Sequence, residues 1–364
     1  MQLRYSFYFN TTGYSISAQD YLLAMRQVSP DKSIKVTAVN GFKPRTGLST
    51  ERYQQFTKLK DTPPENDYIS VQHCIPRIYI SDKAKKRIGV AVYETIDPPT
   101  NWVVRMNEMD HIITASHFNK GVFESNNVQT PVTVVPHCFD PNLFHKDVYP
   151  KGRYNLFTFL YIGTWKERKN FQGLIKAFYD GFSLYDQVCL ILKTDKTKQL
   201  KDTISALKNE NWKTKQTAPI YVLDEVVSFE EIPKLLKKAD VFISPSLGEG
   251  FSLSGLHAMA LNIPVITVRY GGSLEYAKPE LCTHITPSGY KSRPTMDNLP
   301  QFRNKIWPQI KTSEIRDKMR LVYDDQKMAK EKAEIAYKYV HQHFNYDIIG
   351  RRFLSVVEDL ENAS

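Results

Sequence analysis

The sequence predicts an α/β protein with two doubly wound domains that face each other across a cleft. Strand-like and helix-like segments alternate along the whole chain, which is typical of parallel βαβ units. The length of 364 residues is more than one compact core usually holds. A stretch with helix breakers and charge, Pro150-Lys151-Gly152, separates two alternating series of similar size. Ligands of such sheets bind beyond the carboxyl ends of the strands, so we expect the site in the cleft.

The first series contains short apolar runs that read as buried parallel strands. Tyr21, Leu22 and Met25 recur at helical spacing and predict a helix. Pro136 ends the last run. The expected strands are 3–9, 34–39, 68–71, 88–92, 112–114 and 132–135, and the helix is 17–26.

The second series repeats this alternation. Leu174, Ile175 and Phe178 share one helical face, and the segment 313–344 is long, charged and helical. The expected strands are 157–162, 188–192, 220–223, 241–244 and 264–268, and the helices are 170–178, 229–238, 313–344 and 347–360.

Composition excludes several classes of protein. Hydrophobic residues make up 41% and charged residues 24%, an ordinary globular mixture. No apolar run reaches the roughly 18 residues of a membrane span. The first residues, Met1-Gln2-Leu3-Arg4-Tyr5, do not resemble a signal peptide, so we expect a cytoplasmic protein. The four cysteines are scattered without a C-x-x-C pair, which favours neither a zinc site nor a disulfide framework.

The chain is basic, with 49 Lys and Arg against 39 Asp and Glu, or +10. Such an excess suits an anionic partner: nucleotide phosphates, acidic lipid or nucleic acid. The excess is diffuse. Only Lys83, Lys85, Lys86 and Arg87 form a tight run, and a solvated loop is the favoured interpretation of that run over a binding patch.

The segment 244–260 carries the clearest chemical signal. A buried strand, Val241-Phe242-Ile243, leads into a glycine-containing loop that opens a helix. Backbone N–H groups and the positive end of the helix dipole then meet just after Gly250, which predicts a phosphate site. Gly248 and Gly250 would let the backbone approach a ligand closely. The segment contains neither G-x-G-x-x-G nor a P-loop.

Several motifs in this order resemble the family-4 retaining glycosyltransferases. The resemblance runs from about residue 68 to 345. Residues 249–260 (EGFSLSGLHAMA), 263–266 (IPVI) and 271–275 (GGSLE) resemble the nucleotide-sugar segment of that family, and 163–170 (GTWKERKN) with 174–178 (LIKAF) resemble its phosphate-binding loop and helix. The first half adds 110–116, 134–137, 139–140 and Phe144.

The resemblance implies a GT-B fold with two Rossmann-like domains. Residues 1–150 would form the acceptor-side domain, and residues 151–345 would bind the nucleoside-diphosphate sugar. The segment 346–364 would pack back on the first domain. The donor would be a substrate, with no cofactor, and transfer would proceed with retention of configuration.

The resemblance also implies roles for named residues. Glu249 would lie near the donor sugar, and Lys169 and Arg168 would neutralise the leaving diphosphate. For Glu249, the alternative is a carboxylate that the dipole favours at the start of a helix. For Lys169 and Arg168, the alternative is a pair of surface side chains without a specific role. The chain has no Asp-x-Asp, so we expect no metal and a catalytic set of Glu249, Lys169 and Arg168. The expected substrate-binding residues are Gly13, His73, Glu94, Gly250, Phe251, Ser252, Leu253, His257 and Val226.

One position departs from the family pattern. The family has two glutamates eight positions apart, and the second is His257 here. Relatives use that glutamate to hold the ribose hydroxyls, and a histidine offers one acceptor nitrogen in place of a carboxylate. A packed helical histidine beside Leu253, Leu256 and Ala260 is an equally good interpretation.

The acceptor side is less specific. Gly13 fits either a loop against the donor phosphates or a plain strand-to-helix turn. His73 and Glu94 stand at strand ends, where cleft residues belong. Trp102 and His137 are expected to be structural. Val226 lies in the loop 222–227, where relatives bind the nucleobase partly through backbone groups.

These observations favour a glycosyltransferase over other classes. A glycan or lipid-linked acceptor is preferred, with peripheral membrane association through basic residues. The alternative is a phage-type enzyme that modifies a base in DNA, which would suit a charge of +10. A nucleotide-sugar-binding protein without activity and a GT-B epimerase are the further classes that we weigh.

Overall fold

The computed structural model describes residues 2–43, 47–60, 67–150 and 152–363. Lys151 of the expected linker lies outside these residues. The first part contains β1 (Gln2–Phe7), α1 (Gly13–Val28), β2 (Ile34–Ala38), α2 (Thr50–Thr57), β3 (Tyr68–His73), β4 (Lys86–Val90), α3 (Thr100–Asn107), β5 (His111–Thr114), α4 (His117–Ser125) and β6 (Val132–Val134).

The second part follows the same alternation. It contains β7 (Phe157–Ile162), α5 (Phe171–Gly181), β8 (Val188–Lys193), α6 (Thr197–Asn211), β9 (Ile220–Leu223), α7 (Ile232–Leu236), β10 (Val241–Ser244), α8 (Leu253–Ala260), β11 (Val265–Val268), β12 (Thr283–Ile285), β13 (Gly289–Arg293), β14 (Lys305–Gln309), α9 (Thr312–Asp324), α10 (Gln326–His343) and α11 (Tyr346–Asn362).

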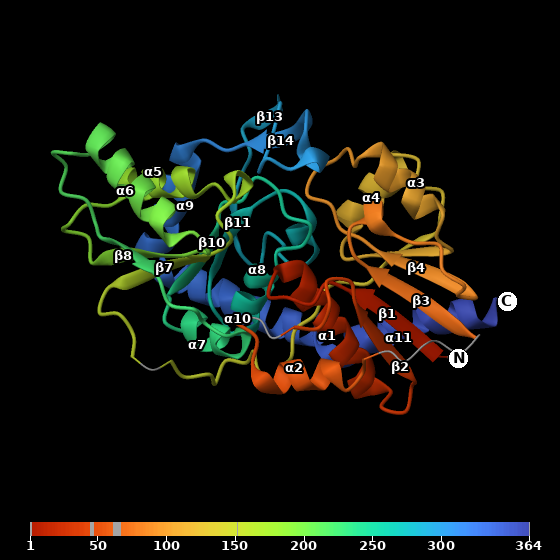
Figure 1. Ribbon diagram of the computed structural model, residues 1–364. Coiled ribbons are helices and arrows are strands. Elements are labelled where there is room, and N and C mark those ends of the chain that lie inside the picture. Colours follow the sequence, from red (N-terminus) through yellow and green to blue (C-terminus); the bar gives the residue numbers. More distant parts are fainter. Residues whose placement is uncertain (1, 44–46, 61–66, 151, 364) are drawn as a thin grey trace.

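Two parallel six-stranded sheets organise these elements (Figure 1). The first has the order β2-β1-β3-β4-β5-β6 and the second β12-β11-β10-β7-β8-β9. Central strands such as β3 and β10 are buried at every residue, because helices cover both faces of the sheet. The predicted architecture of two doubly wound α/β domains is therefore confirmed. We call them the first-sheet and second-sheet domains.

The C-terminal helix α11 belongs to the first-sheet domain in space (Figure 1). Its residues Ile349, Phe353 and Val357 share one hydrophobic core with Tyr5 and Leu22. Helices α1 and α11 approach so closely that a Cβ on Gly350 would lie 2.4 Å from the backbone oxygen of Ala24. A glycine is needed at that crossing because any larger residue would force the helices apart.

Two expected helices differ from the structure. The predicted helix 313–344 is two helices, α9 and α10, separated at Asp325. Asp325 has a non-helical backbone, and its side chain accepts a hydrogen bond from the Met328 amide at 3.0 Å, which starts α10. The predicted helix 229–238 is shorter, with a 3-10 turn at Phe229–Glu231 before α7.

An antiparallel hairpin of β13 and β14 lies outside both large sheets. In Figure 1 it stands at the top, between the two domains. Its residues Met296, Phe302 and Trp307 are fully or almost fully buried in a third core, together with Tyr93 and Trp102 of the first-sheet domain. The hairpin thus joins the two domains at the side opposite α11. The burial of Trp102 agrees with its expected structural role.

Candidate functional site

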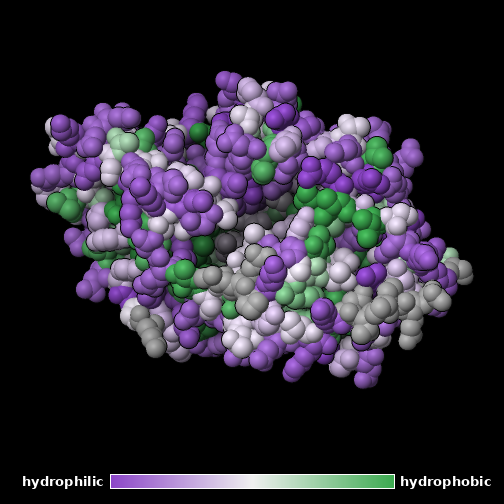
Figure 2. All heavy atoms as spheres, viewed as in Figure 1, coloured by the Kyte–Doolittle hydropathy of each residue, from purple (hydrophilic) through white to green (hydrophobic). Residues whose placement is uncertain are grey.

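A cavity of about 920 Å³ lies between the two sheets, and the surface is hollowed there (Figure 2). Its walls come from segments that follow the carboxyl ends of strands in both domains: β1 and β4 in the first sheet, and β7, β8 and β10 in the second. The cleft position predicted from doubly wound topology is therefore where the large cavity is found.

Ten of the twelve expected site residues line this cavity. They are Gly13, Glu94, Arg168, Lys169, Val226, Glu249, Gly250, Phe251, Ser252 and Leu253. Residues 250–253 lie where α8 begins, so the positive end of the helix dipole faces the cavity. Ser252 adopts the left-handed conformation with φ of 71° at this helix start. His73 and His257 do not line the cavity.

The glycines of the 248–250 loop serve protein packing. A Cβ on Gly248 would lie 2.6 Å from the backbone oxygen of Glu94 and 2.7 Å from Cζ3 of Trp307. A Cβ on Gly250 would lie 2.8 Å from Cγ2 of Val92. The absence of side chains at these two positions thus lets the loop of the first-sheet domain approach, which brings Glu94 beside Glu249. Gly250 also lines the cavity, so its expected contact with a ligand stays a prediction.

A compact cluster of charges occupies one wall of the cavity. Arg168 and Lys169 lie in a 3-10 turn (Glu167–Lys169) between β7 and α5. Lys169 Nζ donates to Glu249 Oε1 at 2.5 Å, and Arg168 Nη1 donates to Glu249 Oε2 at 3.2 Å. Arg168 also faces Glu94 across the domain boundary, with Nη2 3.4 Å from Oε1. The side chains of Arg168, Lys169 and Glu249 are only 15, 16 and 12% exposed.

The protonation states follow from this arrangement. Burial raises the pKa of Glu249, but the Lys169 and Arg168 cations outweigh burial and bring that pKa to about 2. Burial lowers the pKa of Arg168, yet the carboxylates of Glu249 and Glu94 outweigh it and raise the pKa. Glu249 and Arg168 are thus both ionised at neutral pH, and an anionic ligand would meet a preformed ion pair.

The residues missed from the sequence include one carboxylate of this cluster. Asp297, in the hairpin, has its Oδ2 3.1 Å from Arg168 Nε. No motif marks it, because it lies 129 residues from Arg168 in a segment that no expected element covered. Tyr14, Lys193 and Asp195 also line the cavity and were not expected.

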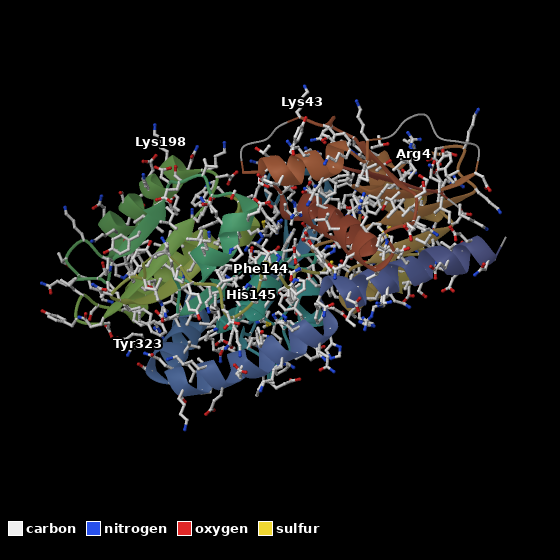
Figure 3. All side chains as sticks on the ribbon, turned by 90° about the horizontal axis from the view of Figure 1, so that it is seen from below. Arg4, Lys43, Phe144, His145, Lys198 and Tyr323 are labelled. Carbon is white, nitrogen blue, oxygen red and sulfur yellow. The ribbon has the colours of Figure 1, made fainter. Side chains whose placement is uncertain are left out.

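The three histidines near the cavity are structural in their contacts. His73 is fully buried, with Nδ1 2.8 Å from the Tyr5 hydroxyl. His137 lines the cavity and is held by the Tyr21 hydroxyl at 2.9 Å from Nδ1. His257 stacks on Phe144, with ring centroids 4.0 Å apart, and its buried Nε2 has no hydrogen-bond partner. Figure 3 shows Phe144 near the middle of the molecule. This geometry supports packing, rather than ribose binding, for His257.

We expect His257→Glu to destabilise the protein. The carboxylate would enter a buried position between the rings of Phe144 and Phe229, where the nearby cation, Arg52, is already paired with Asp20. The free energy of unfolding should fall by about 2 kcal/mol or more in urea titrations. The matched variant His257→Phe, which keeps the stacking and removes an unpartnered nitrogen, should retain stability. A His257→Glu protein of normal stability with tighter nucleoside-diphosphate binding would instead show a ribose contact.

We also expect stability to fall on mild acidification. Burial brings the pKa of both His137 and His257 to about 3, and it lowers the pKa of His73. Below pH 6.5 the unfolded chain binds protons that these folded side chains do not, so unfolding becomes easier as the pH falls. Each such histidine contributes about 1.4 kcal/mol per pH unit. Urea titrations at pH 6.5 and 4.5 measure the slope, and His257→Phe should reduce it. An unchanged slope in that variant would contradict the assignment.

Comparison with known proteins identifies the second-sheet domain. Residues 157–289 match the family model described as glycosyl transferases group 1. The expected resemblance to that family is therefore confirmed, and the match covers β7 through the start of the hairpin.

Two curated proteins are similar to a larger part of the chain. The chain is 24% identical over 278 residues to "Uncharacterized protein 356" of Sulfolobus islandicus rod-shaped virus 1, covering 76% of this chain and 77% of the relative. It is 26% identical over 210 residues to "Uncharacterized glycosyltransferase MJ1178" of Methanocaldococcus jannaschii, covering 57% of this chain and 51% of the relative.

Solved structures share the whole fold. The Anabaena protein HepE, in complex with UDP and glucose, superposes with a TM-score of 0.66 at 15% identity over 98% of this chain and 99% of its own. Sucrose-phosphate synthase from Thermosynechococcus elongatus gives 0.69 at 13% identity over 100% of both chains. The two domains therefore have the GT-B arrangement.

Two kinds of feature are absent from the described residues. Across 2–43, 47–60, 67–150 and 152–363, no group of three or more His, Cys, Asp or Glu side chains is arranged to hold a metal ion. In the same ranges no helix has the length and apolar character that crossing a membrane requires.

Proposed function

We propose that this chain moves a sugar from a nucleoside-diphosphate sugar to an acceptor hydroxyl, with retention of configuration and without a metal. The observation that carries the proposal is the charge cluster of Lys169, Arg168 and Glu249, next to the start of α8 in the interdomain cavity. A diphosphate leaving group needs positive charge around it, and two buried cations with a helix N-terminus supply it. The structural neighbour HepE, which was solved with UDP and glucose, is consistent with such a donor.

The proposed mechanism assigns a task to each part of the cluster. As the bond between the anomeric carbon and the diphosphate breaks, Lys169 and Arg168 stabilise the negative charge that develops on the phosphate. Glu249 lies between the two cations and orients them. The acceptor hydroxyl attacks from the face that the diphosphate leaves. Glu94, on the first-sheet side, and Gly13 would face the acceptor and the phosphates.

We propose a glycan or lipid-linked acceptor and a cytoplasmic enzyme that associates peripherally with a membrane. The excess of ten positive charges supports attraction to an acidic surface. The same charge keeps a DNA acceptor as the second candidate. DNA binding that weakens steeply between low and moderate salt would favour the DNA acceptor. Retained binding to acidic vesicles would favour the glycan or lipid-linked acceptor.

The deciding experiment has a binding step and a turnover step. Thermal melting in UDP, GDP and ADP should give a raised melting temperature with at least one of them, because a ligand of the folded state stabilises it. The matching nucleotide sugar should then release nucleoside diphosphate. Binding without release would favour a protein that only binds nucleotide sugars, and no binding at all would overturn the proposal.

A further inference from the structure

The hairpin of β13 and β14 is fastened to the first-sheet domain by polar contacts. The Tyr93 hydroxyl donates to the Gln301 backbone oxygen at 2.6 Å, and the Thr95 hydroxyl donates to the Ile306 backbone oxygen at 2.5 Å. Lys305 Nζ lies 3.1 Å from Asp97 Oδ2. All three first-sheet residues belong to the loop that also carries Glu94. The hairpin and the Glu94 loop are therefore held as one unit.

The same hairpin reaches the catalytic side of the second-sheet domain. Trp307 is fully buried and packs over Gly248, directly before Glu249. Arg293 Nη1 lies 3.1 Å from Glu167 Oε1, directly before Arg168. Hairpin residues thus contact Gly248 and Glu167, which directly precede Glu249 and Arg168 in the sequence.

Asp297 connects the hairpin to the cluster itself. Its side chain is 1% exposed. Oδ1 accepts a hydrogen bond from the Arg168 backbone amide at 3.1 Å, and Oδ2 lies 3.1 Å from Arg168 Nε. Asp297 has φ of 57°, a left-handed conformation that Asp and Asn tolerate better than most residues. Asp297 therefore hydrogen-bonds the backbone of Arg168 and forms an ion pair, without hydrogen-bond geometry, with its Nε.

The guanidinium of Arg168 is held from two sides. Asp297 does not line the cavity and contacts the Nε edge. At the other end, Nη1 donates to the Gly248 backbone oxygen at 2.9 Å and to Glu249 Oε2 at 3.2 Å, and Nη2 lies 3.4 Å from Glu94 Oε1. An arginine has several rotatable bonds, and anchoring its Nε edge and its backbone removes most of that freedom before a ligand arrives.

We propose that Asp297 is a positioning residue, through which the hairpin sets the Arg168 guanidinium in the cavity wall. The inference rests on the proposed transfer reaction. The negative charge of Asp297 disfavours binding of the diphosphate. The fixed position that Asp297 gives to the Arg168 guanidinium favours the transition state. In donor binding the two effects oppose each other, whereas in the chemical step the order imposed on Arg168 outweighs the charge, so KM and kcat respond differently to the loss of Asp297.

The test is Asp297→Asn. The asparagine side chain keeps an oxygen that can accept from the Arg168 backbone amide, but it carries no negative charge. We expect kcat for donor turnover to fall about tenfold while the donor KM changes by less than about threefold, because the lost repulsion offsets the looser guanidinium. The matched control is Asp186→Asn, since Asp186 likewise accepts from a backbone amide and an arginine, away from the cavity. That variant should keep the kcat of the native protein. A kcat for Asp297→Asn within twofold of native would overturn the proposal.

A double-mutant cycle separates positioning from general structure. If Asp297 acts through Arg168, Asp297→Asn should have no further effect on kcat in an Arg168→Ala background. A loss of kcat that multiplies with that of Arg168→Ala would overturn the proposal. The melting temperature of each variant shows whether it folds.

Hydrogen exchange distinguishes failure of this inference from failure of the proposed function. If the native protein neither binds nor turns over any donor, the transfer reaction is wrong. The contact can still be measured, because Asp297→Ala removes the acceptor of the Arg168 amide. The amide should then exchange faster in Asp297→Ala than in Asp186→Ala. Equal protection in the two variants would show that Asp297 does not hold Arg168.

Discussion

Lys169→Ala should lower turnover of the donor by about a hundredfold or more, the usual cost of removing one preorganised group that stabilises transition-state charge. Lys169 Nζ is the cation nearest to Glu249, and its side chain is 16% exposed at the cavity wall. Without it, the developing phosphate charge would meet Arg168 alone. Steady-state kinetics with the nucleotide sugar found in the melting screen would measure the effect.

The control for this prediction is Lys198→Ala. Lys198 is an exposed lysine on α6, seen at the edge of the molecule in Figure 3, and it does not line the cavity. It should retain native turnover and melting temperature. A near-native rate for Lys169→Ala in a folded protein would remove this lysine from the mechanism.

Glu249→Gln should also lower turnover by about a hundredfold, for a different reason. The amide occupies the same space but no longer orients two cations by charge. The pKa of Glu249 is brought to about 2 by those cations, so the carboxylate is ionised throughout the working pH range. Nucleoside-diphosphate affinity should stay equal or increase, because Lys169 and Arg168 lose a competing anion.

Calorimetric titration and kinetics on the same variant check this opposite movement of affinity and rate. The control is Glu331→Gln, a glutamate on α10 with a side chain 64% exposed. If Glu249→Gln lost nucleoside-diphosphate affinity and turnover together, Glu249 would act in holding the loop rather than in orienting the cations.

Much of the fold was predictable because parallel strands are buried on both faces. Runs such as 157–162, 220–223 and 241–244 coincide with β7, β9 and β10 residue for residue. The helix 313–344 was predicted as one because its pattern continues through Asp325, whose cap depends on the local backbone. The hairpin was missed because neither strand is a continuous buried apolar run: β13 has no buried residue, and β14 has two.

The candidate site was predicted where local sequence carries the chemistry. The loop after β10 brings Glu249 to the cavity, and the turn after β7 brings Arg168 and Lys169. In both cases strand-to-helix geometry alone is sufficient. Asp297 could not be predicted, since its role depends on a tertiary contact with Arg168. His257 was ambiguous for a similar reason: Phe144, which stacks on it, comes from a segment 113 residues earlier.

The position of α11 has a consequence for synthesis of the chain. The hydrophobic core that contains Tyr5 and Leu22 also needs Phe353 and Val357, which are translated after the whole second-sheet domain. Among the described residues, the core of the second-sheet domain includes none beyond Phe344. Domains generally fold as units during translation. Here the half that is translated first must wait, with part of its apolar core uncovered, until α11 emerges, while the half translated later can complete its core before α11 is made.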